Sequence, residues 1–235
     1  GVLLENTIIQ SGAELRQSDF GLDSVINDIP NVANTTLGLG LPIDITSMTV
    51  TLSGTVNGQP FVRNPTSCTA ATITVTANSY ASPGTFVSGD DTFTPTNCGA
   101  LAFSPTFSAR MGSPGQKSPL GKPPVSTVIE QDADEAGLAQ AAVLLPPDLG
   151  VDLAQLNESC PLDVFNAAAC PPNTVIGSAI ATSPLLTQPL TGPVTLGQQP
   201  VLPDIGLSLA GPLNLNLHGT LDFSGSVTFS GLPDI

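Results

Sequence analysis

Apolar and polar residues alternate along long stretches of this chain, and the longest stretch lies near its C-terminal end. Between Leu213 and Phe223 most odd positions hold leucine or phenylalanine, while every even position is polar. Successive residues of a strand point to opposite faces, so a repeat of two predicts a strand with one buried and one wet face. The polar row comprises Asn214, Asn216, His218, Thr220 and Asp222, and the apolar role passes on to Val227 and Phe229.

The same repeat of two marks two earlier segments, 48–56 and 71–77. The first ends at Asn57-Gly58, a dipeptide that strongly favours a tight hairpin turn. The returning arm contains Pro60, which has no backbone N–H to donate to a sheet. This arm is therefore expected to be an edge strand or a bulged strand.

Further strands are expected where short apolar-rich segments stand between turns of glycine, proline and serine. In the turn-rich region before Cys98, Phe86 and Phe93 are expected to face inward in another hairpin. Short helices are expected at 21–29, which Pro30 would end, and at 151–158. The remaining strands are expected at 2–9, 103–110, 176–182, 193–196 and 205–209, and at 125–131 and 138–145 around the acidic turn D-A-D-E-A-G.

Many short strands at fairly even spacing, with little helix, predict an all-β fold. We expect two antiparallel β-sandwich domains with immunoglobulin-like layering and at most one or two short helices. The boundary is placed near Cys98, because a new strand begins shortly after it. Residues 1–98 would then form an N-terminal β domain, and residues 99–235 a C-terminal β-sandwich domain. A helix share above about a quarter would contradict this fold class.

The composition suits a folded β protein and argues against several classes of partner. Of the 235 residues, 40% are hydrophobic and 10% are charged, which is too apolar for a disordered chain. The net charge of −14 repels phosphate backbones and anionic lipid, so we expect neither nucleic-acid binding nor direct membrane insertion. The chain begins at Gly1 without methionine, and we expect a mature product or a fragment that has lost any export signal upstream.

Four cysteines allow three disulfide connectivities. Their spacing fits no zinc pattern, and disulfides formed in an oxidising compartment are favoured over buried free thiols. Pairing Cys160 with Cys170 and Cys68 with Cys98 requires the least loop closure and is therefore preferred. This interpretation places the protein outside the cell or on its surface.

The single histidine, His218, shares the polar row with Asp222 and is a candidate for Ser-His-Asp chemistry. That chemistry also needs a positioned nucleophile, and the sequence holds no G-x-S-x-G elbow. A solvent-facing strand histidine is the favoured interpretation. The acidic residues are scattered in turns, so they do not indicate a glycosidase pair either. We therefore predict no catalytic residue and no organic cofactor.

Two acidic turns are candidates for a calcium site. Asp132, Asp134 and Glu135 with Gly137 resemble the start of a calcium loop, but the glycine is out of register and the closing glutamate is missing. The pair Asp90–Asp91 also lies in a turn-rich stretch. Solvated turns are the favoured interpretation of both segments, so no metal site is predicted.

Several separated blocks of the sequence resemble segments of large exported proteins of high-GC Gram-positive bacteria. The main block reads L-P-P-D-L, then L-N-E-S-C, then F-N-A-A-A-C-P-P-N-T-V-I-G-S-A and S-P-L-L-T-Q-P-L-T-G-P-V-T-L. Upstream, N-P-T-S-C and C-G-A-L-A-F-S-P-T-F-S-A extend the resemblance, which covers about 64–235. Thr174 stands where that family usually has serine. The resemblance implies a secreted or wall-associated β-rich protein, of which this chain is a fragment, and it transfers no catalytic residue.

Together these features favour a non-catalytic structural or adhesive module of a larger secreted or cell-surface protein. Enzymes at neutral pH usually rely on histidine, cysteine, lysine or a metal cluster, and this sequence offers few of these groups. A module that binds a glycan or cell-wall polymer is the alternative, and a hydrolase around His218 is a third, less favoured one. The expected partners are a protein or glycan at the cell exterior and other domains of the same longer chain.

Overall fold

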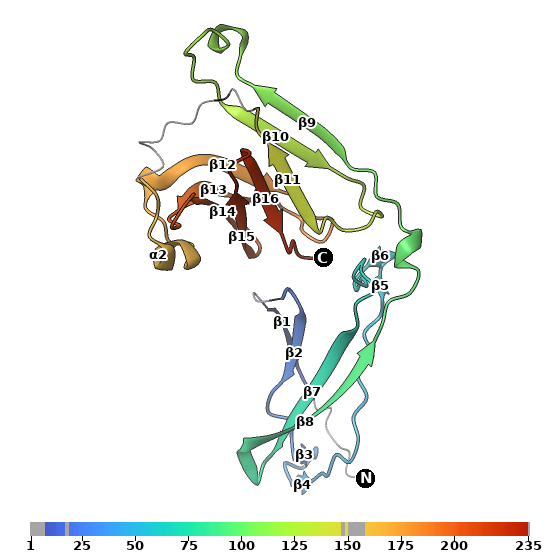
Figure 1. Cartoon of the computed structure of the whole chain (residues 1–235). Coiled ribbons are helices and arrows are strands. Elements are labelled where there is room, and N and C mark those ends of the chain that lie inside the picture. Colours follow the sequence, from blue (N-terminus) through green and yellow to red (C-terminus); the bar gives the residue numbers. More distant parts are fainter. Residues whose placement is uncertain (1–7, 17–18, 147–148, 150–157, 235) are drawn as a thin grey trace. The chain divides into compact units, whose positions relative to one another are not determined.

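The computed structural model describes residues 8–16, 19–146, 149 and 158–234 (Figure 1). Strands account for 44% of the described residues and helices for 6%, which confirms the predicted all-β class. The chain divides into two compact units, Gly1–Arg63 and Asn64–Ile235. Residue 98 lies inside the second unit, and the division into domains at 98/99 stays a prediction, as does the immunoglobulin-like layering.

The described part of the first unit contains three short antiparallel hairpins. The predicted turn at Asn57-Gly58 is present, and both residues have a positive φ, 51° and 76°. The strand predicted at 48–56 is reduced to its last two residues, because its partner meets Pro60 at once and cannot continue the ladder. The hairpins pair β1 (Ser11–Leu15) with β2 (Leu22–Ile26), β3 (Val32–Asn34) with β4 (Gly40–Pro42), and β5 (Thr55–Val56) with β6 (Gln59–Pro60).

The helix predicted at 21–29 is wrong, since most of this segment belongs to strand β2. The N–H of Arg16 donates to the carbonyl of Gly21 at 2.8 Å, so the chain turns back and pairs with β1 instead of coiling. The strand predicted at 2–9 lies almost wholly outside the described residues. The helix predicted at 151–158 is likewise outside them except for its last residue.

The second unit is built on a curled six-stranded antiparallel sheet with the order β11-β16-β15-β14-β13-β12. Strands β12 to β16 are neighbours in chain order, and the last of them, β16, also pairs with β11, the first strand of the sheet in the sequence (Figure 1). The strands are β11 (Gln140–Leu144), β12 (Val175–Ala181), β13 (Leu190–Gly197), β14 (Asp204–Ala210), β15 (Asn214–Leu221) and β16 (Ser226–Ser230).

One face of this sheet carries most of the buried apolar side chains, as the alternation predicted. Leu209 is 2% exposed and Val227 is 7% exposed, while the polar residues of β15 are exposed. Phe223 departs from the pattern with 84% exposure, because it lies in the turn after β15. The core of the unit therefore lies against the apolar face of the curled sheet.

The opposite face is not wholly wet. Helix α2 (Leu162–Asn166) places Phe165 against it, and this side chain is 3% exposed. A Cβ atom on Gly197 or Gly206 would lie 2.5 or 2.6 Å from the Phe165 ring, so only glycine leaves room for it. The short 3-10 helix η3 (Pro172–Thr174) then leads into β12.

Two long hairpins in this unit form separate two-stranded sheets. Strand β7 (Ala71–Ser79) pairs with β8 (Ser82–Phe93), and β9 (Thr106–Met111) pairs with β10 (Val125–Glu130). The 3-10 helix η1 (Cys98–Ala100) lies between the hairpins in the sequence, and η2 (Pro114–Gln116) lies in the loop of the second.

These pairings correct one sequence-based expectation and agree with another. Phe86 and Phe93 were expected to face inward, but they are 65% and 39% exposed, because β8 folds back on β7 and none of the described strands of this unit forms a second layer over the pair. The segments 125–131 and 138–145 contain strands as predicted; the first pairs with β9 and the second with β16. The acidic turn between them is a link between two sheets.

Candidate functional site

The cysteines form two disulfides, Cys68–Cys98 and Cys160–Cys170, with S–S distances of 2.06 and 2.09 Å. These are the pairs that the sequence analysis preferred. Cys68 and Cys98 flank strands β7 and β8, so their disulfide closes the base of that hairpin. Disulfides of this kind are typical of oxidising compartments.

The second disulfide holds the segment that carries α2 against the edge of the sheet. Cys160 is fully buried and forms a parallel bridge with Gly197 of β13. The N–H of Cys160 donates to the carbonyl of Leu196 at 2.8 Å, and the N–H of Gln198 donates to the carbonyl of Cys160 at 2.7 Å. The bridge thus continues the sheet edge past Val175, the first residue of β12, and holds the segment that carries Phe165 next to β13.

His218 lies exposed on β15, as the alternation predicted, and its ring contacts Phe165. The two ring centroids are 4.7 Å apart at an interplanar angle of 38°. Asp222 serves its own turn, where one carboxylate oxygen accepts from the N–H of Ser224 at 2.8 Å and of Ser226 at 3.1 Å. The hydrogen bond from the Ser224 hydroxyl is the main reason why the pKa of Asp222 is lowered. In this geometry His218 packs against Phe165, and Asp222 stabilises the turn between β15 and β16 by its hydrogen bonds.

The acidic turn at 132–137 is hydrogen-bonded to the segment that precedes β9. Glu135 accepts hydrogen bonds from the N–H and the hydroxyl of Ser104. The N–H of Ala136 donates to the carbonyl of Ala102 at 2.9 Å, and that of Glu135 donates to the carbonyl of Asp132 at 3.2 Å. Among the described residues, no group of three or more His, Cys, Asp or Glu is arranged to hold a metal ion.

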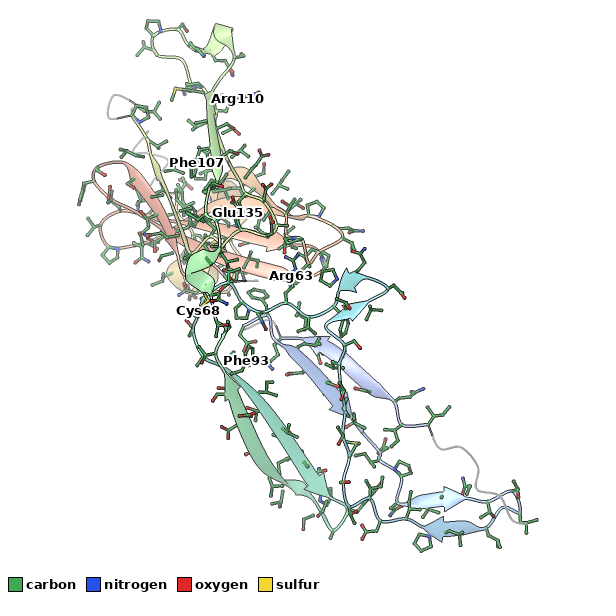
Figure 2. All side chains as sticks on the ribbon, turned by 90° about the vertical axis from the view of Figure 1, so that its right-hand side faces the viewer. Arg63, Cys68, Phe93, Phe107, Arg110 and Glu135 are labelled. Carbon is green, nitrogen blue, oxygen red and sulfur yellow. A yellow bond between two sulfur atoms is a disulfide. The ribbon has the colours of Figure 1, made fainter. Side chains whose placement is uncertain are left out.

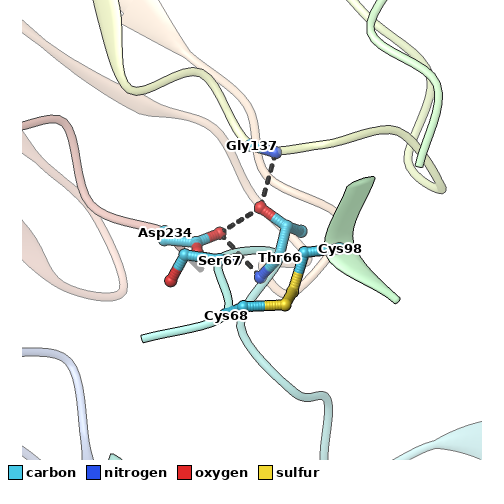
Figure 3. Close-up of a disulfide and its surroundings, with 6 residues drawn as sticks. All are labelled: Thr66, Ser67, Cys68, Cys98, Gly137 and Asp234. Atoms are coloured by element: carbon cyan, nitrogen blue, oxygen red, sulfur yellow. Dashed lines mark hydrogen bonds between the residues drawn. A yellow bond between two sulfur atoms is a disulfide. The ribbon is translucent and has the colours of Figure 1, made fainter. Parts of the chain in front are cut away.

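A partly buried cluster of hydrogen bonds joins three segments that are far apart in the sequence (Figure 3). The Asp234 carboxylate accepts from the hydroxyl of Thr66 at 2.6 Å, the N–H of Thr66 at 3.0 Å and the N–H of Ser67 at 2.7 Å. The Thr66 hydroxyl oxygen in turn accepts from the N–H of Gly137 at 2.7 Å. We call these four residues the Asp234 junction. It ties the end of β16 and the acidic turn to the base of the β7–β8 hairpin.

Close packing and charge shape the Asp234 junction. A Cβ atom on Gly137 would lie 2.7 Å from a carboxylate oxygen of Asp234 and 3.0 Å from the Thr66 hydroxyl, so this position needs glycine. Partial burial raises the pKa of Asp234, but the hydrogen bonds from Thr66 and Ser67 outweigh it and lower the pKa overall. The ionised carboxylate is therefore the form that holds the junction together.

Sequence reasoning missed the Asp234 junction. Its members are separated by 168 residues in one case and 71 in another, and no local pattern links them. The only signals were the position of Thr66 two residues before Cys68 and the L-P-D motif that contains Asp234. Neither signal indicates which residue Thr66 or Asp234 would bind.

The β7–β8 hairpin leaves an amphipathic surface open. Its odd positions are mainly apolar, and Ile73, Val75 and Val87 are 59%, 66% and 70% exposed. Asp91 lies directly opposite Ile73 on the same face, and its carboxylate accepts from the N–H of Thr92 at 2.9 Å. We call the surface of Ile73, Val75, Val87 and Asp91 the acidic hairpin face.

The β9–β10 hairpin differs in charge. Figure 2 shows Arg110 and Phe107 on it, and the register places them on opposite faces. Phe107 is 71% exposed. The loop beyond the strands carries Lys117 and Lys122, both exposed. With Arg110 they form no ion pair to any residue that the structure describes.

None of the described helices is long and apolar enough to cross a membrane. Comparison with known proteins found no matching family model, no matching curated protein and no matching solved structure. The resemblance to exported proteins of high-GC Gram-positive bacteria stays a prediction.

Proposed function

We propose that this chain is a non-catalytic structural or adhesive module of a larger secreted or cell-surface protein. The observation that carries this proposal is the acidic hairpin face. An ordinary soluble domain packs its apolar strand faces in a core, whereas this hairpin presents Ile73, Val75 and Val87 to solvent. A disulfide at its base holds the hairpin in shape without such a core. This combination suits a rigid surface built for contact.

The proposal includes an immunoglobulin-like arrangement of two β-sandwich domains divided near residue 98. An amphipathic hairpin is half of a sandwich, because its apolar face needs a second layer to exclude water. Other domains of the same longer chain, or a protein at the cell exterior, would supply that layer. Extracellular or surface localisation is supported by the two disulfides. We propose neither nucleic-acid binding nor direct membrane insertion, nor any organic cofactor.

Binding of a glycan or cell-wall polymer is the second candidate. The face of the β7–β8 hairpin opposite to the acidic hairpin face presents the exposed side chains of Thr72, Thr74 and Thr76 in a row. Alternate residues of a strand repeat about every 7 Å, so the hydroxyls form a regular array that a repeating polymer can follow. Co-sedimentation with purified cell-wall polymer tests this candidate, with Thr72→Val, Thr74→Val and Thr76→Val together as the variant.

Localisation tests the first proposal most directly. Brief protease treatment of intact cells of the source organism should release peptides of this chain. Mass spectrometry without reduction should show Cys68–Cys98 and Cys160–Cys170 linked. A cytosolic protein followed in parallel controls for lysis. Detection of the chain only after lysis, with four alkylatable thiols, would contradict the proposal.

The third alternative, a hydrolase around His218, has its own test. Ester and glycoside substrates are offered to the protein and to its His218→Ala variant. We expect no turnover by either protein. Turnover that disappears in the variant, while unfolding of the chain is unchanged, would favour the hydrolase.

A further inference from the structure

Most of the basic residues of this chain lie in one hairpin. The segment 92–129 contains no aspartate or glutamate, although the chain has 19 of them. The same segment holds Arg110, Lys117 and Lys122, which are three of the five basic residues. It covers almost all of the β9–β10 hairpin and its loop. A positively charged element therefore belongs to a chain whose net charge is −14.

The loop of this hairpin is ordered by its own hydrogen bonds. The N–H of Gly112 donates to the carbonyl of Pro124 at 2.8 Å, and that of Gly121 donates to the carbonyl of Ser118 at 3.0 Å. Ser113 and Gln116 form a capping box around η2. Lys117 and Lys122 are thus carried on a shaped loop and not on a loose tail.

Leu120 stands between the two lysines and is 100% exposed. Its φ of 63° lies in the left-handed region, which costs a leucine roughly 1–2 kcal/mol. An apolar side chain held away from all cover, in an unfavourable backbone conformation, points to a contact that the isolated chain does not make. We call Arg110, Lys117, Leu120 and Lys122 the basic tip.

The acidic hairpin face has the complementary chemistry. Ile73, Val75 and Val87 offer exposed apolar surface, and Asp91 adds a negative charge on the same face. Asp90 follows on the other face and adds to the local field, which reaches about 8–10 Å at ordinary ionic strength. The β7–β8 hairpin contains no basic residue that would oppose this field.

We propose that the basic tip of one copy of this chain docks on the acidic hairpin face of a second copy. Leu120 meets the apolar side chains, and the lysines approach Asp90 and Asp91. The two surfaces are different, so the interface is heterologous and each copy keeps one free tip and one free face. Repeated docking gives open chains or closed rings. Anionic lipid is the less suitable occupant of the tip, because the remaining acidic surface repels it.

Sedimentation velocity of the wild-type chain and of two charge-reversal variants tests the proposal. The first variant, Lys117→Glu with Lys122→Glu, destroys the tip and keeps the face. The second variant, Asp90→Lys with Asp91→Lys, destroys the face and keeps the tip. All four positions are exposed, and circular dichroism and non-reducing mass spectrometry verify that both variants fold with their disulfides.

We expect the wild-type chain to associate with rising concentration and to dissociate with rising salt, because the contact is partly electrostatic. Each variant alone should remain monomeric. An equal mixture of the two should associate again, because the intact tip of one variant meets the intact face of the other, and the reversed tip and reversed face also carry opposite charges. The Leu120→Ser change should weaken self-association about tenfold, as expected for loss of a buried leucine contact.

The second variant also separates specific docking from general repulsion. It makes the net charge of −14 less negative, so general repulsion predicts stronger association, whereas the proposal predicts its loss. A wild-type chain that stays monomeric up to roughly 1 mM, the weak limit of measurable affinity, would overturn the proposal. Association that survives in either variant, or a mixture that does not recombine, would do the same. Binding of the tip to anionic vesicles without self-association would assign it a lipid partner instead.

The outcome is independent of the proposed function. A chain can be a surface module without self-association, and protease treatment of intact cells reports only on its location. Monomeric behaviour together with surface exposure would overturn the docking proposal alone. Self-association of a cytosolic protein would overturn the proposed function alone.

Discussion

The six-stranded sheet and the β7–β8 hairpin share the same alternation of apolar and polar residues, and they use it differently. Leu209 in the sheet is 2% exposed, whereas Ile73 in the hairpin is 59% exposed. The curled sheet turns its apolar face inward, so its strands cover one another's side chains. The hairpin has two strands, and none of the other described strands of its unit covers them as a second layer. An amphipathic pattern therefore predicts which face is apolar, but burial requires enough neighbours to enclose that face.

The two regions are also held together by different means. In the sheet, burial of side chains such as Leu209 and Phe165 supplies the free energy of folding. An isolated two-stranded hairpin is marginal in water, and here the disulfide Cys68–Cys98 closes its base. The Asp234 junction then ties that base to the acidic turn and the chain end after β16. The hairpin thus depends on cross-links where the sheet depends on a core.

The largest effect is expected from removing the disulfide at the base of the hairpin. Its sequence separation of 30 predicts a loss of about 3.5 kcal/mol by the chain-entropy model when Cys68→Ala and Cys98→Ala are combined. Hydrogen exchange of the β7 and β8 amides should lose its protection, while exchange in β14 and β15 should not change.

The matched control is the combination of Cys160→Ala with Cys170→Ala. Its sequence separation of 10 predicts a smaller loss, of about 2.7 kcal/mol, near the edge of the sheet. The β7–β8 amides should keep their protection in this variant. If both double variants expose the same amides, the hairpin does not depend on its own disulfide.

A somewhat smaller effect is expected from truncating one apolar side chain in each region. Leu209→Ala leaves a cavity in the core and should lower the free energy of unfolding by about 3 kcal/mol. Ile73→Ala removes a side chain that is already in water and should cost less than about 1 kcal/mol. Urea unfolding of the full chain, followed by circular dichroism, measures both. Equal losses would mean that the hairpin face is covered in solution.

The smallest effect concerns the Asp234 junction. The folded pKa of Asp234 lies below its ordinary value of about 3.9, so the ionised carboxylate stabilises the fold above that pH. This contribution is lost as the pH falls through the folded pKa. For Asp234→Asn we expect the free energy of unfolding near pH 7 to fall by about 1 kcal/mol, a figure that allows for the partial exposure of the carboxylate. The difference between the variant and the wild type should become smaller as the pH falls towards 3.

Urea midpoints of the two proteins between pH 7 and pH 3 measure this difference, with Asp134→Asn as the control for removing an exposed charge. The control should leave the midpoint almost unchanged near pH 7. A difference between wild type and Asp234→Asn that grows on acidification would contradict the assignment of the sign.

Much of the local structure was determined by the sequence alone. Strands at 71–77, 176–182 and 205–209 were predicted within a few residues of their observed bounds, because alternation is a property of the extended backbone itself. The turn at Asn57-Gly58 was predicted because these residues adopt positive φ easily. The same two disulfide pairs were preferred because they close the shortest loops.

The partners of these elements were decided only by the tertiary structure. Strand β11 pairs with β16, which lies more than eighty residues later, and no local pattern distinguishes that partner from the adjacent β10. Phe165 reaches its place because Gly197 and Gly206 come together on two neighbouring strands, although the local sequence around each glycine does not indicate an aromatic partner. Asp234 and Thr66 likewise come together only because the fold brings distant segments side by side. Local periodicity reports which way a side chain points, whereas its neighbours depend on how distant segments close around it.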